Sequence, residues 1–171
     1  PSFRVDGHRT VDCDTLGGRN FDFEGPQFLD DKKAVFLMRE DDRIPYASVS
    51  WPGFVGAASG MNIEGVAIVI HGARAGEANP NGEPVAETVR SLLGAARNTR
   101  EAIALLSGRD PMVPHMLLIA DASGDAVVAE RVPGMPVHVR EKRAATLPLT
   151  NHFEVPHAND AKNLDVKAQS S

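Results

Sequence analysis

The segment GGRNFDFEG, residues 17–25, places an arginine and an aspartate three positions apart in an otherwise apolar run. The run reads as a β-strand entered through a Gly-Gly turn. In an extended strand Arg19 and Asp22 point to opposite faces unless a bulge intervenes. A polar group on the core side costs about 1 to 3 kcal/mol if it is unsatisfied. Such a cost is tolerated most often at a site of chemistry, whereas a surface ion pair is the simpler alternative.

Composition narrows the class of protein. The 171 residues are 42% hydrophobic and 24% charged, which is typical of one globular domain and not of a disordered chain. The net charge of −5 argues against nucleic acid as a partner. Cys13 is the only cysteine, so the fold does not depend on an internal disulfide. The cysteine content therefore does not indicate in which cellular compartment the protein works. No apolar run is long enough to predict a membrane span.

Hydrophobic periodicity predicts strands, then two helices, then strands. The first strands are expected at residues 34–38, 46–49 and 66–71. An amphipathic helix is expected over 84–97, and a second helix capped by Thr99 is expected to end at Ser107-Gly108. The later strands are expected at residues 116–119, 126–130 and 137–140, with a hairpin turn at 122–125. The polar residues 158–171 show no clear cap and little that would dock a final element.

Two further segments accompany the opening one. GMNIEG occupies residues 60–65 and LTNHF occupies residues 149–153. The three motifs, in this order, resemble those of linear-amide C–N hydrolases, a group that includes choloylglycine hydrolase, penicillin V acylase and acid ceramidase-like amidases. Within this group the chain most resembles the acyl-CoA:6-aminopenicillanate acyltransferase family, and the resemblance covers nearly the whole chain.

The resemblance implies both a fold and a chemistry. Members are N-terminal nucleophile hydrolases, in which a precursor cleaves itself and exposes a cysteine whose own α-amine serves as base. The implied fold class is α+β, the layered αββα sandwich, with part of it supplied by sequence beyond residue 171. An α-amine has a pKa of about 8, so near neutral pH a useful fraction of it accepts a thiol proton. The resulting thiolate is the nucleophile.

The same resemblance assigns roles to five residues. Arg19 and Asp22 orient and polarise the nucleophile and its amine, and Asn151 donates to the developing oxyanion. His71 is implied at the substrate, because related enzymes place a group facing the acyl pocket where His71 ends its strand. Asn62, in the second motif, is a candidate substrate residue, but we favour a structural role for it, holding a tight turn beside the sheet. From the residues alone, Asn151 and Asn62 also read as turn asparagines, and His71 as an ordinary hydrogen-bonded residue at a strand end.

The nucleophile itself is not in the printed sequence, which begins with Pro1. We expect a cysteine immediately before Pro1, because Cys-Pro-Ser-Phe resembles the family's usual start. Cys13 is the alternative nucleophile. It stands only six residues before Arg19, which is too close for a strand, a turn and a returning strand.

Two alternative functions stay open. Pro1 is a candidate general base, as in tautomerases, although the β-α-β units of those enzymes are not repeated here. The second alternative is that the chain is a non-catalytic binding or scaffold fragment with the fold of the N-terminal nucleophile hydrolases. We expect a single domain over residues 1–171, with no cofactor and no metal site, since the histidines show no i, i+4 pairing. The expected partners are a small-molecule acyl amide or acyl thioester, and another chain or the C-terminal remainder of the same precursor.

Overall fold

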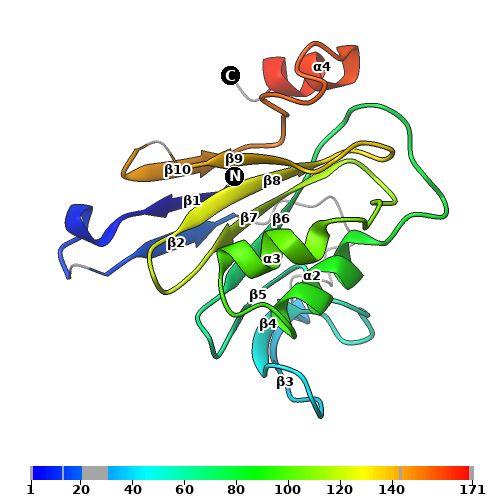
Figure 1. The fold of residues 1–171 in the computed structure, drawn as a ribbon. Coiled ribbons are helices and arrows are strands. Elements are labelled where there is room, and N and C mark those ends of the chain that lie inside the picture. Colours follow the sequence, from blue (N-terminus) through cyan, green and yellow to red (C-terminus); the bar gives the residue numbers. More distant parts are fainter. Residues whose placement is uncertain (1, 13, 21–30, 143, 170–171) are drawn as a thin grey trace.

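The computed structural model describes residues 2–12, 14–20, 31–142 and 144–169. Their strands form two antiparallel sheets, of order β10-β1-β2 and β3-β4-β5-β6-β7-β8-β9 (Figure 1). The strands are β1 (Ser2–Val5), β2 (Leu16–Arg19), β3 (Ala34–Met38), β4 (Tyr46–Ser50), β5 (Ser59–Asn62), β6 (Ala67–Gly72), β7 (His115–Ala120), β8 (Ala126–Arg131), β9 (His138–Glu141) and β10 (Thr146–Leu149). The helices are the 3-10 turn η1 (Gly7–Arg9), then α2 (Val85–Leu93), α3 (Thr99–Leu106) and α4 (Ala161–Gln169).

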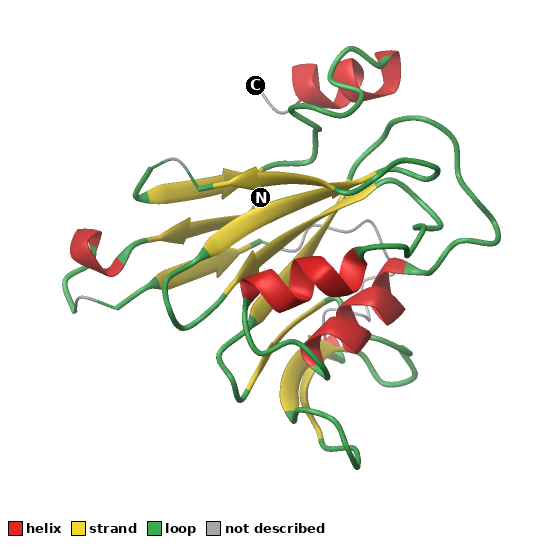
Figure 2. Ribbon diagram, in the orientation of Figure 1, coloured by secondary structure: helices red, strands yellow, loops and turns green. Residues whose placement is uncertain are grey.

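The elements stack in layers. Helices α2 and α3 lie on one face of the seven-stranded sheet, as Figure 2 shows. Their apolar side chains share a buried core with that face, including Leu92, Leu106 and Ile68. The three-stranded sheet packs on the other face through a second core that contains Met116, Leu149 and Phe153. Since β6 contributes alternately to the two cores, each of its residues faces either the helices or the inter-sheet space.

Most expected elements are confirmed. The strand over Ala34–Met38 has the expected bounds, and the strands predicted from residue 46 onward agree to within one or two residues at each end. For the strand expected over 17–25, β2 ends at Arg19, and residues 21–25 lie outside the described residues. The helix expected over 84–97 is shorter, because α2 stops at Leu93 and Gly94 is its C-cap. The helix α3 starts at Thr99, but its cap is the preceding Asn98, whose side chain accepts from the Glu101 backbone N–H at 2.9 Å.

Thr99 has a different partner, which explains why it does not cap the helix. Its backbone N–H and its hydroxyl both donate to Oδ2 of Asp121, at 2.9 and 2.8 Å. Asp121 lies in the β7–β8 turn and also accepts from the backbone N–H of Ser123. Burial raises the pKa of Asp121, but the hydrogen bond from the Ser123 hydroxyl and those from Thr99 and the Ser123 backbone outweigh it and hold the pKa below its ordinary value. The start of α3 is therefore tied to the β7–β8 turn.

The prediction that residues 158–171 carry little that would dock a final element was wrong, because α4 forms over Ala161–Gln169. Asp160 caps it, since Oδ1 of Asp160 accepts from the backbone N–H of Lys162 at 2.8 Å. Asn163 is the buried residue of α4. The docking is therefore polar, and a search for an apolar stripe does not detect it.

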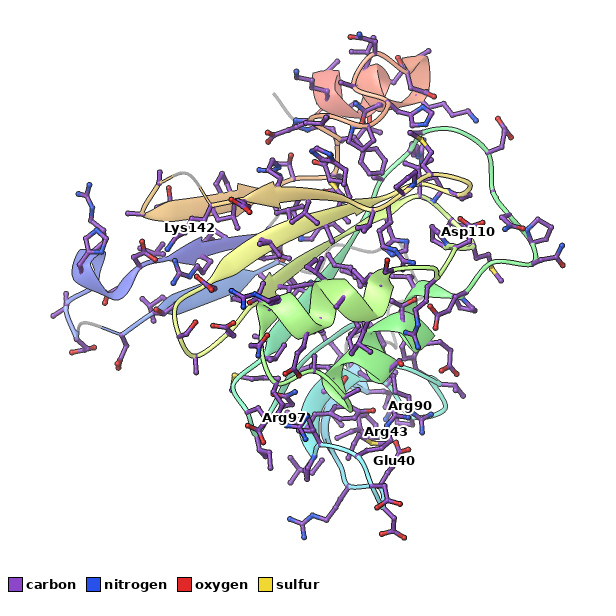
Figure 3. All side chains as sticks on the ribbon, viewed as in Figure 1. Glu40, Arg43, Arg90, Arg97, Asp110 and Lys142 are labelled. Carbon is purple, nitrogen blue, oxygen red and sulfur yellow. The ribbon has the colours of Figure 1, made fainter. Side chains whose placement is uncertain are left out.

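The loop between β3 and β4 is joined to α2 by charged side chains. Arg90 of α2 pairs with Glu40 at 2.8 Å, and Arg43 lies in the same group (Figure 3). The side chains of Arg90 and Glu40 are both about 30% exposed, so the pair is worth at most about 1 kcal/mol. It orients α2 more than it stabilises the sheet.

Candidate active site

The start of β1 meets the ends of three other strands. In the three-stranded sheet Ser2 lies opposite Arg19, the last residue of β2, and opposite Leu149, the last residue of β10. The end of β6, in the seven-stranded sheet, also lies next to Ser2, and the Ser2 hydroxyl and Nε2 of His71 are 2.5 Å apart. We call Ser2, Arg19, His71 and Asn151 the site cluster.

Arg19 joins the two sheets. Its guanidinium donates to the backbone carbonyl of Ile70 in β6 at 3.1 Å and to that of Ala58, just before β5, at 3.4 Å. Burial lowers the pKa of Arg19 to about 10. The side chain therefore stays cationic at neutral pH and lies beside the start of β1. Asp22, the other charged residue of the opening motif, lies outside the described residues, as does Cys13.

His71 faces the inter-sheet space because of strand alternation. It shares this face of β6 with Val69, which packs in the inter-sheet core. Desolvation by burial, together with nearby positive charge that includes Arg19, lowers the pKa of His71 to about 4. The imidazole is therefore neutral at pH 7 and presents one donor and one acceptor nitrogen. It can hold the Ser2 hydroxyl, but it is a weak base.

Asn151 lies two residues beyond β10 and is exposed. Its Nδ2 donates to the backbone carbonyl of Gly72, the neighbour of His71, at 3.0 Å. A side-chain amide carries two N–H groups. One hydrogen bond to a described residue engages one of them, which leaves donor capacity next to the start of β1. The structure therefore brings together Arg19, His71 and Asn151, which stand far apart in the sequence.

Asn62 does not join this cluster. Its amide donates to the carbonyl of Leu93, the last residue of α2, at 2.9 Å and to that of Ala96, just beyond the helix, at 2.8 Å. Its Oδ1 accepts from the backbone N–H groups of Glu64 and Val66, at 3.1 and 2.9 Å. All four bonds are internal, and the side chain is buried. Asn62 holds the turn between β5 and β6 against α2.

The β5–β6 register separates Asn62 from the cluster. In this hairpin Ser59 pairs with Val69, and Asn62 ends β5 at the turn. Ala58, whose carbonyl accepts from Arg19, stands at the opposite end of the strand. Gly65 in the turn has a φ of +84°, a conformation that favours glycine. The described contacts of Asn62 fit a structural role in this turn, and none of them supports a substrate role.

A cavity of about 160 Å³ lies between the sheets beside Arg19. Its lining includes Gly17 and Gly18 from β2 and Val69 from β6. The glycines leave this space because they carry no side chain. A Cβ at Gly18 would also lie 2.4 Å from the ring of Phe3, which covers the strand. A larger cavity of about 240 Å³ is lined by Trp51, Phe54 and other residues of β3, β4, the loop after β4, and α2.

Sequence reasoning missed Ser2 as a member of the site. No local pattern pairs it with a histidine 69 positions away, and only the sheet register brings the two together. Among the residues that the structure describes, no group of three or more His, Cys, Asp or Glu side chains could hold a metal ion. The described helices also include none long and apolar enough to cross a bilayer.

Comparisons with known proteins identify a family and a fold. The chain matches, over residues 9–171, the sequence model of a family described as acyl-coenzyme A:6-aminopenicillanic acid acyl-transferase. A search of curated protein sequences finds no match. The chain is similar in structure to the Caenorhabditis elegans ortholog of N-acylethanolamine-hydrolyzing acid amidase, with a TM-score of 0.72, 14% identity, and coverage of 95% of this chain and 74% of that one.

Two bacterial structures are also similar. One is a variant of conjugated bile acid hydrolase from Clostridium perfringens, with a TM-score of 0.62 and 15% identity over 90% of this chain. The other is penicillin V acylase from Agrobacterium tumefaciens, with a TM-score of 0.59 and 18% identity over 89% of this chain. The chain spans 54% and 53% of these two proteins.

These likenesses establish the fold as that of N-terminal nucleophile hydrolases, a layered α+β architecture that is not the small β-α-β unit of tautomerases. The sequence match covers most of the chain and includes the segments that carry Arg19, His71 and Asn151. The chain therefore belongs to the acyl-coenzyme A:6-aminopenicillanic acid acyl-transferase family of enzymes.

Proposed function

We propose that the protein is an autoprocessed amide hydrolase or acyltransferase that works through an N-terminal cysteine. The observation that carries the proposal is the position of Ser2, beside Arg19 in the sheet and 2.5 Å from His71. A cysteine placed immediately before Pro1 stands two residues ahead of Ser2. Two residues span at most about 7 Å. The thiol would then lie within reach of Arg19, His71 and Asn151.

The chemistry follows from this placement. The α-amine of the cysteine takes the thiol proton, and the thiolate attacks the carbonyl carbon of an acyl amide or acyl thioester. The carbonyl oxygen becomes an oxyanion. As the tetrahedral intermediate collapses, the C–N or C–S bond breaks and the proton on the α-amine passes to the leaving group. Water or an acceptor amine then attacks the acyl-enzyme, loses a proton to the α-amine and releases the thiol.

Each member of the site cluster has a part in this scheme. The Arg19 cation favours the thiolate over the thiol, and its bonds to two backbone carbonyls fix its position. The amide of Asn151 donates to the oxyanion, and such a donor is typically worth about 3 to 4 kcal/mol of transition-state stabilisation. His71, which is neutral, holds Ser2 in place. Asp22 remains the proposed orienting carboxylate for the α-amine.

The substrate class is a small acyl amide or acyl thioester. The nematode relative is named as an acid amidase that hydrolyses N-acylethanolamines, and the family description names an acyl-coenzyme A donor. Both substrates present an acyl carbonyl joined to a heteroatom, which the site cluster would treat alike. Whether water or an amine accepts the acyl group depends on access of water to the acyl-enzyme.

The test begins with the protein expressed from its natural precursor. Intact mass and N-terminal sequencing should show a mature chain that starts with cysteine ahead of Pro1. Incubation with a generic acyl thioester should add one acyl group to that cysteine. Arg19→Leu should slow this acylation at least tenfold, whereas Arg9→Leu, at an exposed position in η1, should not. An active enzyme whose mass corresponds to Pro1 as first residue would overturn the cysteine mechanism.

A further inference from the structure

The segment that carries Asn151 is fixed by a buried residue of α4. Oδ1 of Asn163 accepts from the backbone N–H of Phe153 at 2.7 Å, and Nδ2 donates to the Phe153 carbonyl at 3.0 Å. One side chain therefore satisfies both backbone groups of Phe153, as a neighbouring strand would. Asn163 is fully buried, and the Phe153 ring is buried in the inter-sheet core. The anchor lies two residues after Asn151.

A second buried side chain holds the same segment from the sheet. The carboxylate of Glu130 in β8 accepts from the backbone N–H groups of Glu154 and Val155, at 3.3 and 3.4 Å. Arg140 is 3.5 Å from the same carboxylate. Burying a carboxylate is unfavourable unless it is paired and hydrogen-bonded, and here its partners include the segment that follows Asn151. Residues 153–155 are thus anchored on both sides.

Helix α4 also contacts the segment that follows β6. Oδ2 of Asp160 accepts from the backbone N–H of Gly76 at 3.1 Å. Nζ of Lys162 donates to the carbonyl of the same glycine at 2.7 Å. Gly76 lies four residues beyond Gly72, whose carbonyl accepts from Asn151. One short helix therefore links the chain on both sides of the Asn151–Gly72 hydrogen bond.

We propose that Asn163 is a positioning residue, which sets where the Asn151 amide points in the site. This inference rests on the proposed function, because it assumes that Asn151 donates to an oxyanion. Asn151 is exposed and makes one hydrogen bond to the described residues, so its own contacts define its position weakly. A donor displaced by about 1 Å can cost on the order of 100-fold in rate. The remaining anchors at Glu130 and Gly72 should reduce this loss.

The first measurement uses Asn163→Ala in the full-length mature protein. We expect kcat to fall about tenfold while KM stays within about twofold, because the oxyanion forms only after substrate has bound. Asp165→Ala, an exposed position of the same helix, is the control and should retain full kcat. Hydrogen exchange should show faster exchange of the Phe153 amide in Asn163→Ala. Unchanged kcat despite that faster exchange would overturn the inference.

A double-mutant cycle separates positioning from general destabilisation. If Asn163 acts through Asn151, Asn163→Ala should lower kcat less than twofold in an Asn151→Ala background. An equal fractional loss in both backgrounds would overturn the inference. If Asn163→Ala does not fold, Asn163→Asp replaces it in the cycle, since it keeps an acceptor for Phe153 and loses the donated bonds. Full kcat in the Asn151→Ala single variant would overturn the oxyanion role that the proposed function assigns to Asn151. Full kcat in the Asn163→Ala single variant, with a loss in Asn151→Ala, would overturn only the positioning role of Asn163.

Discussion

The two motif asparagines, Asn62 and Asn151, occupy opposite kinds of environment. Asn62 is buried and makes four hydrogen bonds within the protein, so it has no capacity left for a ligand. Asn151 is exposed and makes one hydrogen bond to a described residue, the carbonyl of Gly72. Both come from short segments that resemble one family. The comparison teaches that a motif residue can be retained for architecture or for chemistry, and that its hydrogen-bond inventory separates the two.

Two buried histidines extend the comparison. The pKa of each is lowered to about 4, chiefly by desolvation. His115 is enclosed, with Nδ1 2.8 Å from the carbonyl of Val113 and Nε2 3.5 Å from Arg131. His71 instead meets Ser2 at the site cluster. A buried histidine with a lowered pKa thus occurs once inside a structural network, at His115, and once at the candidate site, at His71.

Asn151→Ala should give the largest effect on activity. Removal of one oxyanion donor typically lowers kcat about 100- to 1,000-fold. Since the side chain is exposed, the melting temperature should change by no more than about 2 °C. Steady-state hydrolysis of an acyl amide and a thermal melt measure the two quantities. A large loss of stability with normal kcat would reverse the roles that we assign to the two asparagines.

Asn62→Ala should give the opposite result. Two backbone N–H groups and two carbonyls lose their partner, and each buried unsatisfied group costs about 1 to 3 kcal/mol before relaxation. We expect the free energy of unfolding to fall by about 3 kcal/mol, with kcat per folded molecule within about threefold of the parent. Urea unfolding followed by circular dichroism measures the change. A kcat loss as large as that of Asn151→Ala would place Asn62 at the substrate after all.

Acidification should destabilise the protein between pH 6.5 and pH 4. His71 and His115 titrate near 6.5 when unfolded and near 4 when folded, so in this range the unfolded chain binds more protons. The free energy of unfolding therefore falls as pH falls, by on the order of 1 to 2 kcal/mol for each histidine at pH 5. His115→Gln should remove about half of this loss. An unchanged pH dependence in that variant would contradict the assigned pKa of His115.

Asn98→Ala should give the smallest effect. It removes the side-chain cap of α3, which is worth about 1 kcal/mol. Chemical denaturation should detect this change, while kcat stays the same because α3 lies on the helical face of the seven-stranded sheet, away from the site cluster. Arg100→Ala, an exposed position of the same helix, is the control. A measurable change in kcat would show that the two regions are coupled through the sheet.

Local patterns account for much of the fold. The apolar run over Ala34–Met38 predicted its strand with the right bounds, and alternation correctly places His71 on the same face as Val69. The end of α2 was predicted too late, although Gly94 is a local stop signal, and carbonyls near that end accept from Asn62, more than 30 positions away. A tertiary hydrogen bond thus replaces the last turn that helix propensity favours.

The candidate site was predicted only through the three motifs together. Arg19 and Asn151 read as turn or surface residues when taken singly, and their proximity depends on both being at strand ends that flank Ser2. The docking of α4 was missed for a different reason. Asn163 anchors by hydrogen bonds to backbone groups, and such bonds leave no periodic signal in a sequence.

The central place of β1 in its sheet bears on how the protein is produced. With β10 on one side and β2 on the other, β1 can receive additional polypeptide only at its Ser2 end, next to Arg19 and His71. Under the proposed function, a segment that stayed uncleaved there would occupy the space that the substrate needs, so turnover should require its removal.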